Sequence, residues 1–228
     1  MKIVNILVLL SILLALAASQ ATAQGLPPIP QAFRGAVTVN GQPAPVGTQV
    51  EARGDNVNNP VADNPRTTAQ AGWYGRPSQL DLAVSGNENL TDGTLLRFYV
   101  NDMRAECQPE GGAWGLTSPF ASGTTTQLNL RLVSPVLRIS KLNSTTARLS
   151  WDAVTGAVSY ALYRSTTPYL TPADPPYQTV AGLSYDDVGA LGNPSVNYFY
   201  LLKVVYDDGK GMASHRVGEF DFSLTPGS

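Results

Sequence analysis

The stretch "RLSWDAVTGAVSYALYRS", which runs from Arg148 to Ser165, decides the fold of the second half of the chain. In an extended strand that ends at Trp151, Leu149 and Trp151 lie on one face, because successive side chains alternate along a strand. In the next strand, Tyr160 and Leu162 share a face in the same way. Rows with large aromatic residues fill the layer of about 10 Å between two sheets packed face to face. The stretch therefore predicts the interior of a β-sandwich and not the wall of an active site.

Similar alternation continues through the second half, where seven strands are expected in roughly 90 residues, the size of an immunoglobulin-like sandwich. The expected segments are 136–140, 147–151, 158–164, 177–182, 183–187, 197–206 and 212–224. In segment 197–206, Tyr198 and Tyr200 fall on the same face as the apolar residues that follow. We therefore expect Trp151, Tyr160 and Tyr198 to be core residues.

The same residues carry a resemblance. "ARLSWDAVTGAVSYALYRS", followed by "NYFYLLKVVYDDGKGMASHRVGEF", resembles a bacterial fibronectin type III domain over residues 135–226. The resemblance implies that Trp151 ends the second strand and packs in the core. It also implies that Tyr198, at the start of the sixth strand, bonds to upstream backbone. Members of this family serve as binding or spacer modules.

The first half also alternates, in the segments 33–39, 48–53, 80–84, 94–101 and 124–133, with a long polar loop over 54–65. Short strands between turn signals indicate a further all-β sandwich over residues 32–133, separated from the second at Ser134-Pro135. "FRGAVTVNGQPAPVGTQVEARGD", "GWYG" and "DGTLLRFYVND" resemble a carboxypeptidase regulatory-like, transthyretin-type domain of exported surface proteins. No agreed chemistry comes with that resemblance.

The N-terminus reads as a secretory signal peptide over residues 1–23. A Lys precedes an apolar run from Ile3 to Ala18, and the small-residue site Ala21-Thr22-Ala23 follows. The run is shorter than the roughly 20 apolar residues of a membrane span. We expect a secreted or cell-surface protein with no span after cleavage, beginning with a Pro-rich spacer over residues 24–31.

The net charge and the cysteine content limit the kinds of binding partner that the chain is expected to have. The chain has 15 basic and 17 acidic residues, and loss of the signal's single Lys takes the net charge from −2 to −3. This balance, with no basic cluster, argues against nucleic acid. Cys107 is the sole cysteine, so no disulfide forms within the chain. Pairing between chains is the alternative to a half-buried thiol.

The residues offer little for catalysis. His215 is the only His, and one His with one Cys does not make a zinc site. We expect no enzyme activity and no cofactor. For calcium, Asp186-Asp187 and Asp207-Asp208-Gly209 are candidates, although the second pattern is typical of a hairpin turn. The triplet Arg53-Gly54-Asp55 would act in adhesion only from an exposed loop tip.

Aromatic residues in glycine-rich segments are the candidate ligand-binding residues: Trp73, Tyr74 and Trp114. Such rings either stack on a sugar or cap a sandwich core. Two hypotheses follow. The first is a non-catalytic exported protein for adhesion, binding or spacing, whose partner is an envelope or extracellular protein or glycan. The alternative is a pair of carbohydrate-binding modules associated with secreted polysaccharide-degrading enzymes.

Overall fold

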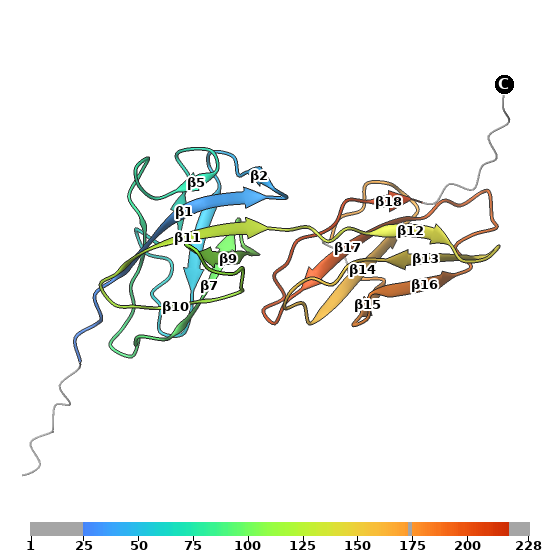
Figure 1. Cartoon of the computed structure of the whole chain (residues 1–228). Coiled ribbons are helices and arrows are strands. Elements are labelled where there is room, and N and C mark those ends of the chain that lie inside the picture. Colours follow the sequence, from blue (N-terminus) through green and yellow to red (C-terminus); the bar gives the residue numbers. More distant parts are fainter. Residues whose placement is uncertain (1–24, 173–174, 219–228) are drawn as a thin grey trace, which may run out of the picture.

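The computed structural model describes residues 25–172 and 175–218, and its regular elements are β-strands. They form two sandwiches placed end to end (Figure 1). Within these ranges there is no helix that could cross a membrane. The prediction of an all-β chain with two consecutive immunoglobulin-like sandwiches is confirmed, whereas the predicted signal over 1–23 lies outside the described residues.

The first sandwich has one six-stranded sheet. Its order is β2-β1-β11-β9, with β5 and β6 also paired to β1, and β1 and β11 run parallel. The strands are β1 (Gln31–Val39), β2 (Gln42–Pro43), β5 (Trp73–Tyr74), β6 (Leu82–Val84), β9 (Glu106–Pro109) and β11 (Thr125–Leu132). Gln31, placed by the sequence in the spacer, is a buried strand residue whose side chain hydrogen bonds to Thr126 and to the N–H of Ala121. These bonds tie the start of β1 into the sheet.

The opposing sheet has the order β10-β7-β3-β4, with β8 paired to β7. Its strands are β3 (Gln49–Arg53), β4 (Arg66–Thr67), β7 (Leu95–Val100), β8 (Met103–Arg104) and β10 (Ser118–Pro119). Asn101 and Asp102 join β7 to β8 with φ angles of 48° and 63°. Positive φ at both central residues is the geometry of a type I′ hairpin turn, which Asn and Asp tolerate. The turn projects Asp102 toward the second sandwich.

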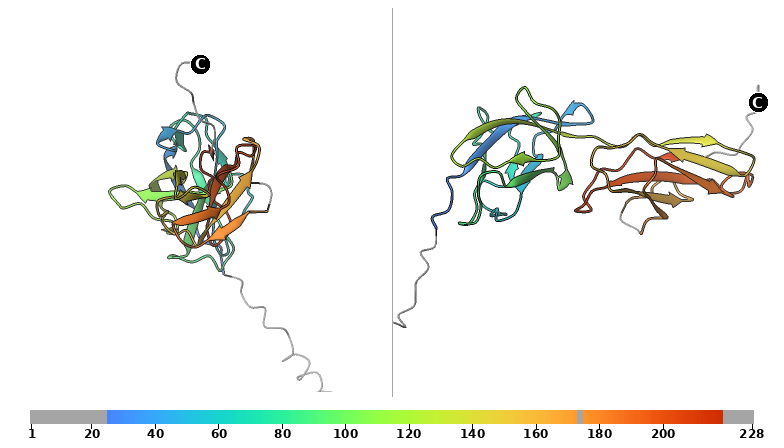
Figure 2. Two further views of the ribbon diagram at one scale, coloured as in Figure 1. Left: turned by 90° about the vertical axis from the view of Figure 1, so that its right-hand side faces the viewer. Right: turned by 60° about the horizontal axis from the view of Figure 1, so that its bottom comes forward.

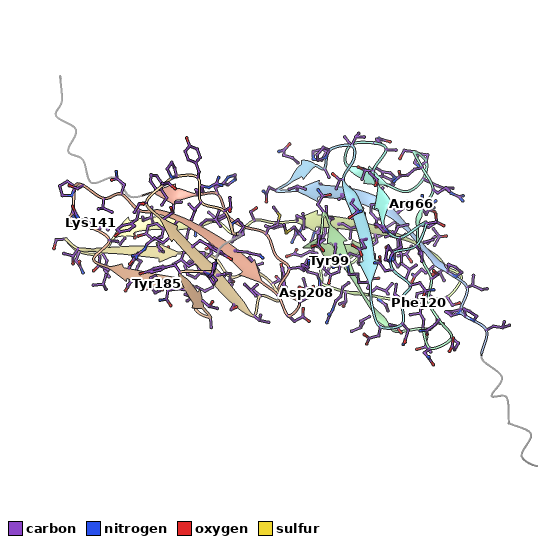
Figure 3. All side chains as sticks on the ribbon, turned by 180° about the vertical axis from the view of Figure 1, so that it is seen from behind. Arg66, Tyr99, Phe120, Lys141, Tyr185 and Asp208 are labelled. Atoms are coloured by element: carbon purple, nitrogen blue, oxygen red, sulfur yellow. The ribbon has the colours of Figure 1, made fainter. Side chains whose placement is uncertain are left out.

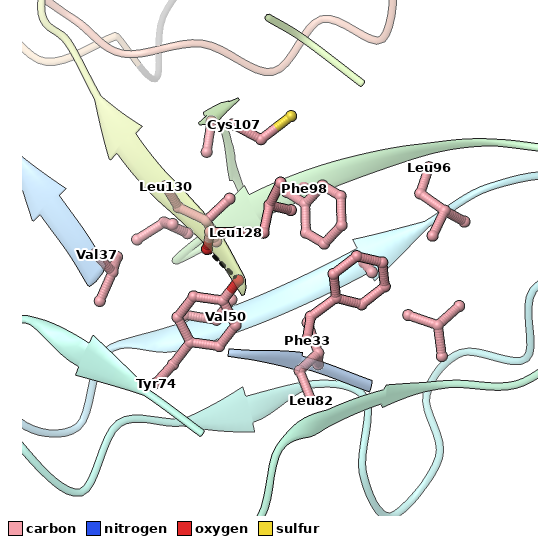
Figure 4. Packing of buried hydrophobic residues seen from close by; sticks show 14 of the residues in the cluster. Phe33, Val37, Val50, Tyr74, Leu82, Leu96, Phe98, Cys107, Leu128 and Leu130 are labelled. Atoms are coloured by element: carbon pink, nitrogen blue, oxygen red, sulfur yellow. Dashed lines mark hydrogen bonds between the residues drawn. The ribbon is translucent and has the colours of Figure 1, made fainter. Parts of the chain in front are cut away.

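The core of the first sandwich follows from the alternation in β1 and β11, where every second residue is buried along most of each strand. Phe33 of one sheet meets Phe98 of the other edge to face, with ring centroids 5.1 Å apart (Figure 4). Gly35 is required because a Cβ there would lie 2.3 Å from the carbonyl oxygen of Leu128. The two strands therefore come close only because residue 35 has no side chain.

The second sandwich pairs a three-stranded sheet, β12-β13-β16, with a four-stranded sheet, β15-β14-β17-β18. The strands are β12 (Arg138–Lys141), β13 (Thr146–Ser150), β14 (Ser159–Ser165), β15 (Gln178–Val180), β16 (Ser184–Val188), β17 (Phe199–Val205) and β18 (Val217–Gly218). This is a fibronectin type III-like all-β arrangement of seven strands. The expected seventh segment, 212–224, is much longer than β18, and its residues 219–224 lie outside the described part.

The core of the second sandwich contains Trp151 and Tyr160 of the opening stretch, whereas the third aromatic residue of that stretch, Tyr163, packs in a separate cluster with Ala161 and Leu201. Trp151 is 3% exposed and Tyr160 4% exposed, and their rings lie 5.4 Å apart. Tyr200 is fully buried. Tyr198, which precedes β17, is half-buried and packs against the edge of this core. The large ring at the centre of the sixth strand is therefore that of Tyr200, two residues further along the same face.

The two sandwiches lie along one line. β1 starts at the end of the first sandwich that is remote from the second, and the last described strand, β18, follows a segment that runs away from the first (Figure 1). The right-hand view of Figure 2 shows the same elongated arrangement, and the left-hand view looks along the pair, so that the two sandwiches overlap. The described chain thus enters at one end of the pair and leaves toward the other.

Candidate functional site

The three candidate ligand-binding residues do not share one environment. Trp73 is half-buried in β5, and its Nε1–H donates a hydrogen bond of 2.7 Å to the carbonyl oxygen of Arg76. Tyr74 is 0% exposed, and its hydroxyl donates to the carbonyl oxygen of Leu128 at 2.7 Å (Figure 4). Burial raises the pKa of Tyr74 well above its ordinary value. Tyr74 is a core residue, so its prediction as a ligand-binding residue is wrong.

Trp114 is half-buried in the loop after β9, where Gly115 forms a bridge with Cys107. The guanidinium carbon of Arg131 lies 4.1 Å from the centroid of its ring. Arg131 is itself fixed by its Nε–H, which donates to the carboxylate of Glu106 at 2.7 Å. One face of the indole is therefore covered by a cation.

A cluster of charged contacts lies where the two sandwiches meet. Arg104, whose side chain is 3% exposed, donates to the carboxylates of Asp207 and Asp208 in the second sandwich, at 3.4 and 3.2 Å. Arg97 reaches Asp207 at 2.8 Å. The hydroxyl of Tyr99 donates to Asp208 at 2.5 Å, and Figure 3 shows these two side chains close together at the junction. Three residues of the first sandwich thus hold one acidic turn of the second.

A second contact at the junction runs from the turn between β7 and β8. Asp102 accepts hydrogen bonds from Lys210 of the second sandwich and from Arg53. These bonds lower the pKa of Asp102 below its ordinary value, Lys210 contributing most. The pKa of Asp208 is also lowered. Burial acts to raise it, but hydrogen bonds from Tyr99 and from the backbone N–H of Lys210, with the charge of Arg104, outweigh that effect.

Apolar side chains interlock beside these charges. Leu116 of the first sandwich packs against the core of the second. Met212 of the second sandwich packs against the core of the first. Gly156 allows the first contact, because a Cβ there would lie 2.0 Å from a methyl carbon of Leu116. Each sandwich therefore contributes a side chain to the rim of the other's core.

A groove of about 800 Å³ opens beside the junction, over β3 and β7. Its lining includes Arg53, Gly54 and Asp55, together with Arg97 and Lys210. Arg53 and Arg97 are cross-strand partners, and like charges in that position repel. Carboxylates compensate both: Arg53 donates to Glu51 at 2.8 and 2.6 Å and to Asp102, and Arg97 pairs with Asp207.

The contacts of Arg53 determine how the Arg53-Gly54-Asp55 triplet is presented. The guanidinium of Arg53 lies 4.0 Å from the centroid of the Tyr99 ring, in addition to its ion pairs. Arg53 is the last residue of β3, and Asp55 is exposed in the turn that follows. The arginine of the triplet is therefore engaged within the protein.

The candidate calcium ligands are held by cations. Asp186 pairs with Arg148 at 2.7 Å. Asp187 is 1% exposed and accepts hydrogen bonds from Arg164 at 3.0 Å and from the hydroxyls of Tyr177 and Tyr200 at 3.1 and 2.8 Å. In the described residues, no group of three or more His, Cys, Asp or Glu side chains is placed to hold a metal ion.

The remaining reactive residues lie apart. His215 is exposed next to the last strand. Cys107 is 1% exposed in the core of the first sandwich, and burial raises the pKa of its thiol to about 11. Pairing of Cys107 between folded chains would require it to leave the core, so the alternative of an interchain disulfide does not fit this structure.

Sequence reasoning missed the junction. Asp207-Asp208-Gly209 is a turn, with φ of 74° at the glycine, as the pattern predicted. Its partners Arg97 and Arg104 lie more than 100 positions away in the chain, so no local spacing reveals the contact. The pair Asn101-Asp102 was the available signal for the hairpin that brings Arg104 to this place.

Comparison with known proteins identifies no family for the chain. No protein-family model and no curated protein matches it. An Fn3-like protein from Clostridium thermocellum is 24% identical over 41% of this chain and 98% of its own, with a TM-score of 0.32. The FN1-FN3 domains of chicken CNTN1 are 14% identical over 86% of this chain and 65% of theirs, with a TM-score of 0.34.

Polysaccharide-degrading enzymes are also among the neighbours. Pectate lyase PelI from Erwinia chrysanthemi, in complex with tetragalacturonic acid, is 18% identical over 38% of this chain, with a TM-score of 0.29. The similarity covers only 27% of that enzyme. Likenesses this low do not define a function. The resemblance of the first half to a transthyretin-type domain stays a prediction.

Proposed function

We propose that the chain is an exported, non-catalytic module that acts as a rigid two-domain spacer and binding unit at the cell surface. The observation that carries the proposal is the junction, in which the buried guanidinium of Arg104 joins the first sandwich to Asp207 and Asp208 of the second. A spacer must keep a fixed length, and a two-domain spacer keeps its length only if the domains do not move relative to each other.

Relative motion is the default for domains in one chain unless their interface holds them. Here Leu116 and Met212 interlock the two cores, and two sets of ion pairs flank them. Buried, directional bonds fix an orientation better than a flexible linker does. Because the described chain enters at one end and leaves toward the other, the pair extends whatever it joins by the length of two sandwiches (Figure 1).

Two further features support the non-catalytic and exported parts of the proposal. The four aspartates considered as calcium ligands, Asp186, Asp187, Asp207 and Asp208, are each paired with an arginine. The order of charge, apolar run and small-residue site over residues 1–23 is typical of a secretory signal. The partner is then an envelope or extracellular component, protein or glycan.

The test is to express the full chain with a C-terminal tag in a bacterial host and to recover it from each cell fraction. The proposal predicts an extracellular or envelope-associated protein whose mature N-terminus is Gln24, with no hydrolysis of polysaccharide, peptide or ester substrates. A cytoplasmic protein that keeps its N-terminal residues would contradict the exported role. A turnover that co-purifies with the chain and survives extensive purification would contradict the non-catalytic role.

A further inference from the structure

The outer face of the six-stranded sheet in the first sandwich carries a row of side chains that crosses the strands. Ala36 of β1 pairs with Trp73 of β5, and its N–H donates to Asn129 Oδ1 of β11 at 3.0 Å. Asn129 pairs with Gln108 of β9. The bridge between Cys107 and Gly115 places Trp114 beside Gln108. We name these five residues the tryptophan row.

The row points away from the core. The sequence neighbours Val37, Tyr74, Cys107, Leu128 and Leu130 are buried within the first sandwich. Because side chains alternate between the two faces of a sheet, the residues of the row lie on the opposite, solvent side. The row crosses four inter-strand spacings, about 19 Å at roughly 4.8 Å each. It therefore has an indole at each end and amide side chains between them.

Both indoles are fixed in place. Trp73 is tied to the carbonyl oxygen of Arg76, and Trp114 lies against Arg131, which is bound to Glu106. A half-buried ring held by such contacts loses little conformational freedom on binding, which is the property that makes rigid aromatic residues good anchors.

The charges of the strands that carry the row are compensated. Arg131 is paired with Glu106, and Arg34 lies 3.9 Å from the carboxylate of Asp81. A nucleic acid requires uncompensated cations. In protein interfaces the aromatic anchors cluster together at a more apolar centre, whereas here Asn129 and Gln108 separate the indoles. A neutral sugar chain has apolar C–H faces for the indoles and hydroxyls for the amides.

We propose that the tryptophan row binds a neutral polysaccharide, laid across the strands of the first sandwich. Pyranose rings stack on Trp73 and on the face of Trp114 opposite Arg131. Sugar hydroxyls bond to Asn129 Nδ2 and Gln108 Oε1, because Asn129 Oδ1 accepts from Ala36 N–H and Gln108 Nε2 donates to the carbonyl oxygen of Gly112 at 2.9 Å. This binding site does not depend on the spacer function proposed above, since the row lies within one sandwich. It gives that spacer a surface to which it attaches.

The experiment uses the full mature chain in affinity electrophoresis and pull-down assays with cellulose, a β-1,3-glucan and a mannan, and with polygalacturonate as the acidic comparison. The expected result is retention by at least one neutral polymer, weakened about tenfold in Trp73→Ala and in Trp114→Ala. Sodium chloride at about 0.5 M should leave the retention unchanged, because no charges are involved. Tyr169→Ala, which removes an aromatic ring that is 85% exposed on the second sandwich, is the matched control.

Asn129→Asp keeps the shape of the side chain and the oxygen that accepts from Ala36 N–H, and it adds a charge to the middle of the row, so it tests the site without removing an indole. It should weaken retention as well. Three results would overturn the proposal: no retention on any neutral polymer, retention that only polygalacturonate gives, or retention that Tyr169→Ala reduces as much as the tryptophan variants do. Thermal denaturation of each variant shows whether a loss of binding reflects unfolding.

Discussion

Replacement of Arg104 by Met should loosen the junction between the two sandwiches. The wild-type guanidinium donates to Asp208 at 3.2 Å, to Asp207 at 3.4 Å and to the carbonyl oxygen of Leu116 at 3.3 Å. Met keeps an unbranched apolar stem that reaches as far as the arginine Nε, but it removes the guanidinium, its charge and all three bonds. The substitution therefore isolates the polar part of the junction.

The size of the effect follows from what the carboxylates retain. Removing one partner of a fully buried ion pair costs about 3–5 kcal/mol. Here Asp207 is half exposed and keeps Arg97, and Asp208 keeps the hydroxyl of Tyr99 and the N–H of Lys210. Neither carboxylate is left without a hydrogen-bond partner, and the hydrogen bonds that are lost are long. We therefore expect a loss of about 2 kcal/mol in the free energy of unfolding.

Urea denaturation of the full chain, with fluorescence as the probe, measures this loss. A double-mutant cycle with Asp208→Asn should return a coupling energy of about 1–2 kcal/mol. Arg138→Met is the matched control, because it breaks an exposed ion pair with Asp152 inside the second sandwich, and little change is expected from it. A coupling energy near zero, or equal losses for the two arginine variants, would show that the bonds of Arg104 do not hold the two sandwiches together.

Four other predictions follow. Cys107, with a thiol pKa raised to about 11, should not react with a disulfide reagent at pH 8 until the chain is unfolded; fast reaction of the native protein would place the thiol at the surface. Asp187→Ala should destabilise the second sandwich by about 3–5 kcal/mol in chemical denaturation, since it leaves an arginine and two tyrosine hydroxyls without their acceptor. Gly35→Ala should lower the thermal midpoint of the first sandwich markedly, because the added carbon would lie 2.3 Å from a carbonyl oxygen of β11, and an unchanged midpoint would contradict the close approach. The pKa values of Asp102 and Asp208 are lowered below their ordinary value, so the stability that these carboxylates contribute is present above the ordinary value and is lost as the pH falls through the lowered folded-state values; the junction should hold at about pH 5 and loosen progressively in more acidic solution, as seen by small-angle scattering.

Much of the fold could be predicted from period-two alternation alone. The expected segment 94–101 matches β7, and 124–133 matches β11, each to within one residue at either end. Strands of two residues, such as β5 and β8, carry no period and were not predicted. They exist because longer strands beside them offer free hydrogen-bonding groups, which is a property of the assembled sheet.

The candidate site, too, could be predicted only in part, because the sequence does not show how its strands pair. In "GWYG" the sequence identifies two aromatic residues but not which of them faces the core. The pairing of β5 with β1 decides it. Tyr74 lies opposite Gly35, on the face of β1 that carries the buried residues Phe33 and Val37, whereas Trp73 lies opposite Ala36 on the other face. The sequence does not predict the junction for a related reason, because Arg104 and its partners Asp207 and Asp208 are distant in the chain.

Residual dipolar couplings of the full chain measure whether the junction between the two sandwiches is rigid. Couplings from the two sandwiches, fitted separately to the structure, report how each one is oriented in a weakly aligned sample. If Arg104, Tyr99 and the interlocked Leu116 and Met212 hold the pair as described, both sets should yield one common alignment tensor. Two tensors that differ in magnitude and direction would show that the sandwiches move independently, and would contradict a rigid spacer.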